Sequence, residues 1–304
     1  MLKGVIFSLI ASFLFGYIYY FSTLLEPLTT NQIFGYRIIF TFPFVLGAVF
    51  LLNQKSFIVE HFKRMQQKPW LILVFMTTSA ITGFEMWLFL WAPIHNQALS
   101  VSLGYLLLPL IMVLVGRIFL KEYISHLKSI AVLLAFIGVS INIMMTGGLS
   151  WASAAVSGYA LYFLLRKLFN ITDLASFLIE VILMLPICFY FISDVDYAMI
   201  QQHNTYILWL LPLLGLFSGL AFIAYIAASN YLPINLLGLL GYAEPALLLV
   251  VSFVIGDTVK PENYPLFISL LLAMGFIIAD GIKQMKEQRK QKQLKTARHL
   301  ATGH

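Results

Sequence analysis

The sequence predicts an all-α integral membrane protein with ten transmembrane helices arranged as two inverted five-helix repeats. Composition is the first observation: hydrophobic residues make up 61% of the 304 residues and charged residues only 11%. A soluble domain has about 25% charged residues, so the composition excludes an ordinary soluble protein. The other two observations are a series of apolar stretches of transmembrane length and an internal duplication.

The apolar stretches are long enough to cross a bilayer as helices. A transmembrane helix needs about 20 mostly apolar residues. The first stretch lacks a small-residue cleavage signature, so we expect a retained helix and no signal peptide. The ten expected spans are 3–22, 31–53, 70–92, 97–117, 128–146, 150–166, 174–193, 205–228, 233–255 and 264–282.

The duplication appears where the sequence matches itself. Ala92 to Pro109 aligns with Ala228 to Pro245 at an offset of 136 residues. Upstream, Gly16-Tyr17-x-x-Tyr20 aligns with Gly158-Tyr159-x-x-Tyr162 at an offset of 142. Internal duplication in a very apolar chain is typical of secondary transporters, whose substrate site lies between the repeats near the bilayer midplane.

Five spans per copy predict the organisation of the chain. An odd number of spans makes the second copy enter the membrane from the opposite side, so the repeats are inverted. The expected parts are a first repeat over 1–146, a second repeat over 147–282 and a basic cytoplasmic tail over 283–304. The links between spans leave no room for a soluble domain.

Basic residues predict that both termini are cytoplasmic. With this orientation, only two of the 19 Lys and Arg lie outside the cytoplasmic segments: Lys260 in an outside loop and Arg37 within a span. The positive-inside rule favours this arrangement over its reverse. The net charge of +6 is therefore read as an orientation signal, with the tail attracted to anionic lipid headgroups and not to nucleic acid.

Four charged residues inside the spans are the candidate binding residues: Arg37, Glu85, Glu180 and Glu244. An ionisable group at mid-bilayer costs about 2.5 to 3.5 kcal/mol on insertion scales and usually faces a cavity or a partner. At 1.5 Å per residue, Arg37 and Glu85 reach nearly the same depth. We expect them to form a charge pair, or to share a water or substrate group.

Glu180 and Glu244 are the other two acids. Glu180 is the repeat counterpart of Arg37, and Arg166 is its nearest cation along the sequence. Glu244 has no cation near its expected depth, which makes it the first candidate for proton coupling or for binding a cationic group. The alternative is that these acids only hold helices together, or that Glu244 bonds a carbonyl freed beside Pro245.

Aromatic residues and prolines are weaker candidates. Tyr20, Trp87, Trp91 and Tyr105 are candidates for an aromatic cavity suited to a planar or cationic substrate, although aromatics near helix ends commonly form interfacial belts. Pro109 and Pro245 occupy matching positions in the two halves and are candidates for helix breaks that expose backbone to a site. Ordinary kinks are the alternative.

No motif for enzymatic chemistry is present. The sequence has no His-Glu-x-x-His, no Gly-x-Ser-x-Gly and no Gly-x-x-x-x-Gly-Lys, the motifs of metalloproteases, serine hydrolases and nucleotide hydrolases. His61, His126 and His203 are expected in loops, and the single cysteine, Cys188, excludes an internal disulfide. We therefore expect no cofactor, no metal and no catalytic residues.

Several motifs resemble a known family. The runs are Trp87-Leu-Phe-Leu-Trp-Ala92, Ser102-Leu-Gly-Tyr-Leu-Leu-Leu-Pro-Leu110, Phe119-Leu-Lys-Glu122 and Gly241-Tyr-Ala-Glu-Pro245. Together they resemble the drug/metabolite transporter superfamily, EamA type, in its RarD branch. The resemblance spans both halves and implies a bacterial inner-membrane permease of ten helices with a central cavity, in many cases an exporter.

The sequence therefore predicts a secondary active transporter of small organic metabolites or drugs. We expect alternating access with proton coupling or exchange, because no ATP site is present. The expected partners are a small organic solute and membrane lipid, with the protein a monomer or homodimer. A membrane enzyme, or a passive channel or scaffold without coupled transport, is the alternative.

Overall fold

The described part of the chain is all-helical, without a strand, and eight of its helices are long and apolar enough to cross a membrane. The computed structural model describes residues 2–119, 121, 124–147, 149–232 and 240–301. An all-α membrane protein is thereby confirmed. In chain order the helices are α1 (Leu2–Phe21), η1 (Ser22–Leu25), α2 (Thr30–Leu51), α3 (Lys55–Gln67), α4 (Leu71–Ile94), α5 (Ala98–Phe119), α6 (His126–Thr146), α7 (Trp151–Ser157), α8 (Ala160–Leu168), α9 (Leu174–Ile192), α10 (Tyr197–His203), α11 (Ile207–Tyr231), α13 (Ala243–Ile255), η2 (Pro261–Asn263) and α14 (Tyr264–Ala301).

Local sequence signals set several helix ends. Thr29 and Gln32 form a capping box at the start of α2, each side chain accepting from the other residue's backbone N–H. Asp173 caps α9 by accepting from the Ser176 N–H at 2.8 Å. α6 ends at Gly147, whose φ of +80° is left-handed backbone that glycine adopts without strain.

Two expected spans differ from a single long helix. The span expected at 150–166 is described as two short helices, with α7 ending at Ser157 and α8 beginning at Ala160. Gly158 and Tyr159 between them keep right-handed helical backbone, and the N–H groups of Leu161 and Tyr162 bond three residues back, so the chain passes from α7 to α8 through a tighter turn. The span expected at 233–255 is described only as α13, about 20 Å long, because residues 233–239 lie outside the described residues. The ten-helix arrangement stays a prediction.

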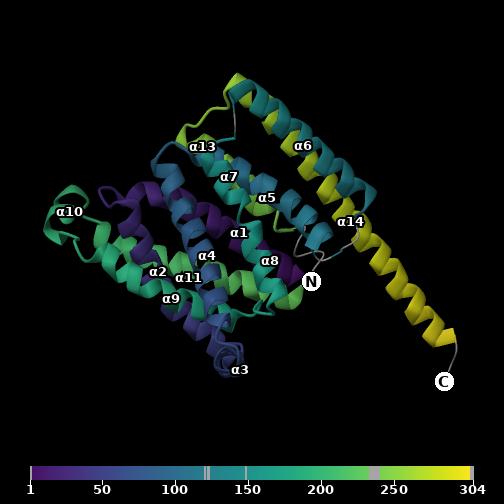
Figure 1. Cartoon of the computed structure of the whole chain (residues 1–304), viewed down its shortest axis with the longest axis horizontal. Helices are drawn as coiled ribbons and strands as arrows, with labels where there is room; N and C mark the ends of the chain where they lie inside the picture. The colour runs from purple at the N-terminus through teal and green to yellow at the C-terminus, as the bar shows by residue number, and fades with distance from the viewer. Residues whose placement is uncertain (1, 120, 122–123, 148, 233–239, 302–304) are drawn as a thin grey trace.

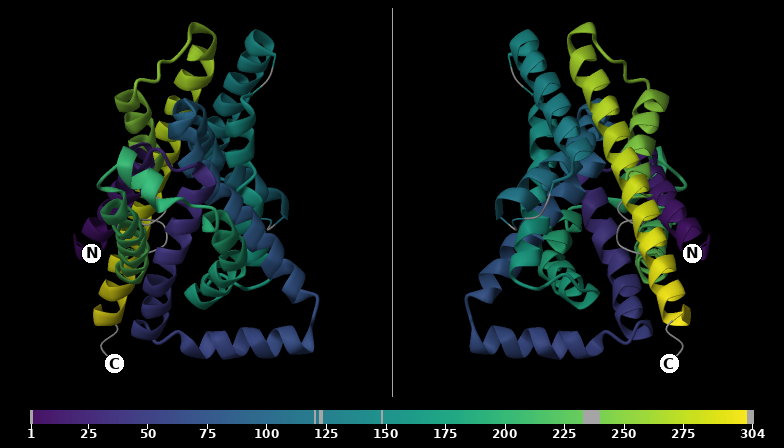
Figure 2. Two further views of the ribbon diagram at one scale, coloured as in Figure 1. Left: turned by 90° about the vertical axis from the view of Figure 1, so that its left-hand side faces the viewer. Right: turned by 90° about the vertical axis from the view of Figure 1, so that its right-hand side faces the viewer.

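The basic link between α2 and α4 is a helix and not a loop. α3 runs crosswise over one end of the bundle (Figure 2). His61 belongs to this helix, while His126 and His203 belong to α6 and α10, so the expectation that these three lie in loops was wrong. At the other terminus, α14 continues as one helix from the last span into the basic tail, projecting beyond the bundle in Figure 1.

Helices from the two halves of the chain pack against each other. α2 packs on α9, α6 on α14, α5 on α13 and α1 on α11, and Figure 1 shows α6 and α14 side by side along one edge. Gly215 and Gly219 allow α11 to approach α2 closely, because a Cβ there would lie 2.2 Å from the Phe40 side chain and 2.3 Å from the Phe44 side chain.

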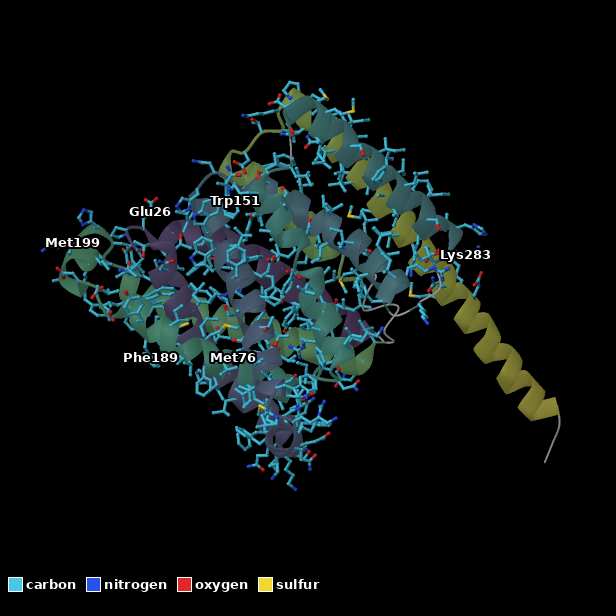
Figure 3. All side chains as sticks on the ribbon, viewed as in Figure 1. Glu26, Met76, Trp151, Phe189, Met199 and Lys283 are labelled. Atoms are coloured by element: carbon cyan, nitrogen blue, oxygen red, sulfur yellow. The ribbon has the colours of Figure 1, made fainter. Side chains whose placement is uncertain are left out.

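The outer surface of the bundle carries large apolar side chains. Met76 on α4 is 53% exposed, Phe136 on α6 is 68% exposed and Phe189 on α9 is 56% exposed; Figure 3 labels Met76 and Phe189. Extensive exposed apolar surface marks contact with another apolar phase. The surface therefore suits a lipid environment.

Candidate functional site

A cavity of about 590 Å³ lies inside the bundle. Its walls come from both halves of the chain, and we call it the central cavity. Its lining includes charged, tyrosine and phenylalanine side chains. The residues that line it include Arg37, Thr82, Glu85, Met86, Phe89, Tyr105, Pro109, Tyr159, Tyr162, Arg166, Asp173, Phe222, Tyr225, Glu244 and Pro245.

Arg37 extends from α2 into the central cavity and is only 3% exposed. Its Nε donates to Ser218 Oγ at 3.1 Å, and Nη1 donates to the Met86 carbonyl at 3.5 Å. The guanidinium carbon lies 5.4 Å from the centre of the Phe89 ring, within cation–π range. The guanidinium also interacts electrostatically with Glu244. Arg37 is therefore held by neutral groups, with a charged group opposite.

Glu85 lies in the same cavity but does not pair directly with Arg37. The two side chains form no ion pair within 4 Å, so the direct charge pair expected from their depths is absent. Glu85 interacts with Tyr105 instead, and its Oε1 is buried without a hydrogen-bond partner. An unsatisfied buried carboxylate oxygen is costly, so Glu85 has capacity left for a ligand or a proton. Whether Arg37 and Glu85 share a water or substrate group stays a prediction.

Glu244 lies in the first turn of α13 and lines the central cavity. The sequence-based expectation that no cation is near it was wrong, because Arg37 interacts with it electrostatically. The N-terminus of a helix also favours a negative charge. The acid that interacts with Arg37 electrostatically, without an ion pair within 4 Å, therefore comes from the second half of the chain.

Glu180 is held in an ion pair at the edge of this site. Its Oε2 accepts from Arg166 Nη1 at 2.9 Å and from the Tyr162 hydroxyl at 3.0 Å. Arg166 also donates from Nη2 to Ser176 Oγ at 2.9 Å. Glu180 is fully buried and does not line the central cavity, whereas Arg166 does. The neighbour that the sequence suggested for Glu180 is thus its ion-pair partner.

Two tyrosines that sequence reasoning left out of the site line the cavity. Tyr159 and Tyr162 stack with ring centres 4.9 Å apart, and the Tyr159 hydroxyl lies 3.0 Å from Thr82 Oγ1. Tyr159 lies in the turn between α7 and α8, and Tyr162 lies in the first turn of α8. The Gly-Tyr-x-x-Tyr match between the two halves was a signal that could have identified them.

Three aromatic candidates lie elsewhere. Tyr20, Trp87 and Trp91 are absent from the lining of the central cavity, unlike Tyr105. Trp87 Nε1 donates to Asn31 Oδ1 at 2.8 Å in an exposed position, and Trp91 stacks on His95 at 4.5 Å. For Trp87 and Trp91, this arrangement fits the alternative of an aromatic belt near the helix ends.

The two prolines line the cavity without breaking a helix at their own positions. α5 continues through Pro109, and Pro245 lies in the first turn of α13. Proline is tolerated in a first turn because the N–H there has no helical partner. The expectation of a break at Pro109 was therefore wrong, and the alternative of a proline within a continuous helix applies.

Asp173 connects the central cavity to α3. Its Oδ2 lies 2.8 Å from His61 Nε2, and His61 is buried. Partial burial favours a raised pKa for Asp173, but the hydrogen bonds from His61 and from the Ser176 N–H outweigh it, so its pKa lies below the ordinary value. The cavity thus extends from Arg37 and Glu85 to the end of the bundle that α3 crosses.

Known proteins resemble this chain over nearly its whole length. Residues 2–144 match the EamA-like transporter family. An uncharacterized transporter of Pasteurella multocida is 55% identical over 95% of this chain and 100% of its own length. The chloramphenicol-sensitive protein RarD of Pseudomonas aeruginosa is 36% identical over 94% of this chain and 97% of its own length. Protein RarD of Escherichia coli is 27% identical over 92% of this chain and 95% of its own.

No solved structure matches the chain. The relatives are named as transporters or as RarD proteins and not as enzymes. The identities and coverage, together with the apolar helices and the motifs shared by both halves, establish the family. The chain belongs to the drug/metabolite transporter superfamily, EamA type, in its RarD branch.

Proposed function

We propose that this protein is a secondary active transporter of small organic solutes, with the central cavity as its substrate site. The observation that carries the proposal is the cavity itself: a volume of about 590 Å³ inside a membrane bundle, lined by two arginines, two glutamates, one aspartate and several aromatic rings. Ionisable groups inside a membrane usually mark a substrate or ion pathway. Among the described residues, Arg37, Glu85 and Glu244 take part in no ion pair within 4 Å, which supports a role for all three in binding a ligand.

The proposal includes ten spans in two inverted repeats. Helix pairing supports it, because α2 with α9, α5 with α13 and α6 with α14 each join elements at matching positions of the two sequence copies. The segment α7–α8 and the helix α13, which follows residues outside the described part of the chain, are the proposed sixth and ninth spans.

The proposed orientation has both termini in the cytoplasm of a bacterial inner membrane. The distribution of Lys and Arg supports it. With this orientation the end of the cavity near Asp173 faces the cytoplasm. At the opposite end, the Tyr19 hydroxyl donates to the Ala98 carbonyl at 2.8 Å and the Leu99 N–H donates to Asp257 Oδ2 at 2.7 Å. These bonds hold helix ends together there, which supports a cytoplasm-facing state in an alternating-access cycle.

Glu244 and Glu85 are the proposed proton or substrate-binding acids. Both lie in the cavity, whereas Glu180 is occupied by Arg166 and Tyr162. Protonation of Glu244 changes the charge near Arg37, and protonation of Glu85 changes the charge beside Tyr105; in the proposal, either change biases which side of the transporter opens. Arg166 and Asp173 of the lining have Glu180 and His61 as partners, which leaves Arg37 with the two glutamates, and this arrangement favours a zwitterionic or cationic solute.

The first test is a thermal-shift screen of the detergent-purified protein. Amino acids, amines, vitamins, sugars and antibiotics are screened at two pH values, because a ligand that prefers the native state raises its stability by mass action. Chloramphenicol is included because the Pseudomonas relative is named for sensitivity to it. We expect a compound whose shift is lost in Glu244→Gln.

The second test measures uptake of that compound into vesicles with an imposed pH gradient. Wild-type protein is expected to accumulate it against its gradient, and Glu244→Gln to lose this accumulation while remaining folded. Unchanged accumulation in both Glu244→Gln and Glu85→Gln would overturn the coupling role. Equilibration without accumulation at any pH or counter-solute would favour a passive channel.

A further inference from the structure

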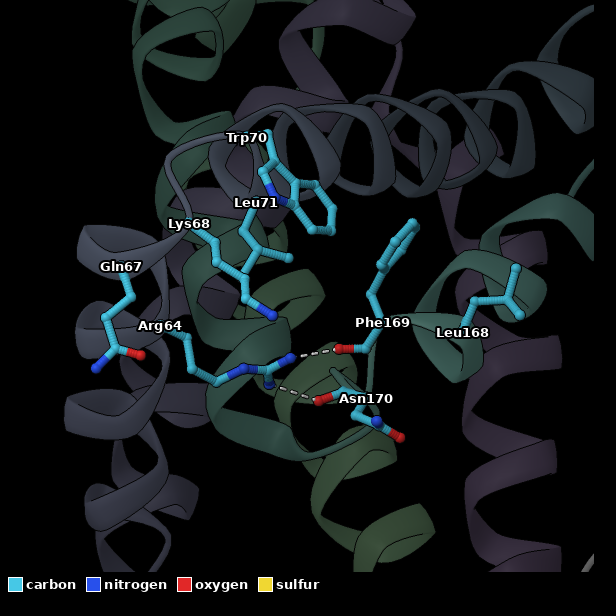
Figure 4. Close-up of a pocket in the computed structure, with 8 residues that line it drawn as sticks. All are labelled: Arg64, Gln67, Lys68, Trp70, Leu71, Leu168, Phe169 and Asn170. Carbon is cyan, nitrogen blue, oxygen red and sulfur yellow. Dashed lines mark hydrogen bonds between the residues drawn. The ribbon is translucent and has the colours of Figure 1, made fainter.

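A second cleft lies at the end of the bundle that α3 crosses. It has a volume of about 340 Å³ and is formed by the end of α3, the start of α4 and the link between α8 and α9. We call it the basic cleft. Figure 4 shows its lining residues: Arg64, Gln67, Lys68, Trp70, Leu71, Leu168, Phe169 and Asn170.

Two cations converge in the basic cleft without a carboxylate. Arg64 donates from Nη1 to the Asn170 carbonyl at 2.9 Å and from Nη2 to the Phe169 carbonyl at 2.6 Å. These bonds fix the guanidinium and leave its other N–H groups available. The Lys68 side chain points toward Arg64 in Figure 4, and no acid lines the cleft.

Nearby acids do not neutralise this pair. Glu60, one turn before Arg64 on α3, forms no ion pair with it within 4 Å, and neither Arg64 nor Lys68 takes part in an ion pair among the described residues. Two like charges facing one cleft repel each other, and an anion bound between them would remove that cost. The charge arrangement therefore points to an anionic ligand.

The surface next to the basic cleft is apolar. Trp70 packs edge-on against Phe169 with ring centres 5.3 Å apart and is 48% exposed. Along α4, Leu73 is 66% exposed and Met76 is 53% exposed. The cleft thus lies where the apolar surface of α4 begins, with an exposed tryptophan at the boundary, as at membrane interfaces.

We propose that the basic cleft binds the phosphate headgroup of an anionic membrane lipid, with the acyl chains along Leu73 and Met76. A free phosphate would satisfy Arg64 and Lys68 equally well, but it would not use the adjoining apolar surface. The phosphodiester of a lipid such as phosphatidylglycerol matches both parts. By binding across α3, α4 and the α8–α9 link, the lipid would stabilise the cytoplasmic end of the proposed transporter.

The test measures lipid binding to the full-length purified protein by native mass spectrometry. Phosphatidylglycerol, phosphatidylcholine and inorganic phosphate are the probes. We expect phosphatidylglycerol to bind in preference to phosphatidylcholine, and Lys68→Gln to weaken it about fivefold, the effect of removing one basic contact to an anionic lipid. Lys63→Gln is the matched control, because Lys63 is an exposed lysine on α3 outside the cleft.

Three outcomes would overturn the proposal. Equal phosphatidylglycerol binding in Lys68→Gln and wild type would show that the lipid does not bind in the basic cleft. Equal losses in Lys68→Gln and Lys63→Gln would mean general attraction to a basic surface. Competition by millimolar inorganic phosphate, with no preference for lipid, would assign the cleft to a soluble phosphate. Recovery of binding in Lys68→Arg would add support, because the charge is restored.

Discussion

Arg166 and Glu180 form a buried ion pair that joins α8 to α9, with Arg166 Nη1 2.9 Å from Glu180 Oε2. The Tyr162 hydroxyl donates to the same carboxylate oxygen, and Ser176 accepts from the other Arg166 nitrogen. Glu180 Oε2 is satisfied in this way, while Oε1 is buried without a hydrogen-bond partner among the described residues. Because Glu180 does not line the central cavity, we expect its carboxylate not to contact substrate there. Its contribution is to hold Tyr162 at the wall of the central cavity.

Removing the negative charge of this pair is expected to destabilise the protein. Glu180→Gln leaves the Arg166 guanidinium buried without a counter-charge, and breaking one side of a buried pair costs about 3 kcal/mol or more. The expected result is a lower midpoint in a denaturant titration of the purified protein, whether or not ligand is present.

The double variant Arg166→Met/Glu180→Met distinguishes two causes of lost stability: loss of the ion pair itself, and burial of one charge without its partner. It removes both charges, so it should cost less than Glu180→Gln alone. If Glu180→Gln kept wild-type stability but lost pH-driven uptake, Glu180 would be a coupling residue and our assignment would fail.

The sequence predicted which residues are charged within the membrane better than which of them meet. Residue positions along the expected spans suggested Arg166 as the neighbour of Glu180, and the two side chains form an ion pair. Counting residues from the helix ends placed Arg37 and Glu85 at nearly the same depth in the membrane, yet Arg37 interacts with Glu244 and Ser218. Depth along a helix follows from residue counting, but the side of the helix that a residue faces depends on packing between distant segments.

The two Gly-Tyr-x-x-Tyr copies differ in what they contribute to the cavity. Tyr20 of the first copy was a candidate and does not line it, whereas Tyr159 and Tyr162 of the second copy do. Sequence matching finds equivalent positions, but it does not show which copy faces the cavity, because that depends on packing between distant segments.

The Asp173–His61 contact predicts a pH dependence of stability. The folded-state pKa of Asp173 is below its ordinary value. The ionised Asp173 therefore stabilises the folded protein fully above the ordinary aspartate pKa of about 3.9, and this stabilisation is lost as pH falls through the lower folded-state pKa. Asp173→Asn should therefore lower the unfolding temperature near neutral pH. The variant should also lose the part of the fall in unfolding temperature at acid pH that comes from protonation of Asp173.

Thermal unfolding measured from neutral pH down to about pH 2, through the region below the ordinary aspartate pKa, checks this prediction. The control is Asp194→Asn, which changes an exposed aspartate outside the cavity. Identical pH profiles for Asp173→Asn and Asp194→Asn would show that the contact with His61 contributes nothing to folding.

Ligand binding should distinguish the cavity aromatics from the tryptophans near the helix ends. Tyr105→Ala removes a ring from the central cavity, and an aromatic contact is worth about 0.5 to 1.5 kcal/mol, so affinity for the screened ligand should fall about two- to tenfold. Trp91→Phe keeps a ring in the stack with His95 outside the cavity and should change affinity little. Isothermal titration of each variant measures both effects, and a larger loss in Trp91→Phe would move the site toward that stack.

The contact between α2 and α11 should not tolerate one added methyl group. A Cβ at Gly215 would lie 2.2 Å from the Phe40 Cβ and 3.0 Å from the Phe40 carbonyl carbon, so the helices would have to separate. Overpacking of this kind costs about 1 to 3 kcal/mol, and Gly215→Ala should unfold at correspondingly lower denaturant concentration. Gly47→Ala on α2 is the matched control, because a Cβ there meets nothing within 4 Å and alanine favours a helix over glycine. If Gly215→Ala were as stable as Gly47→Ala, the close approach of α2 and α11 would not be a determinant of folding, and the walls of the cavity that these helices form would tolerate a wider separation.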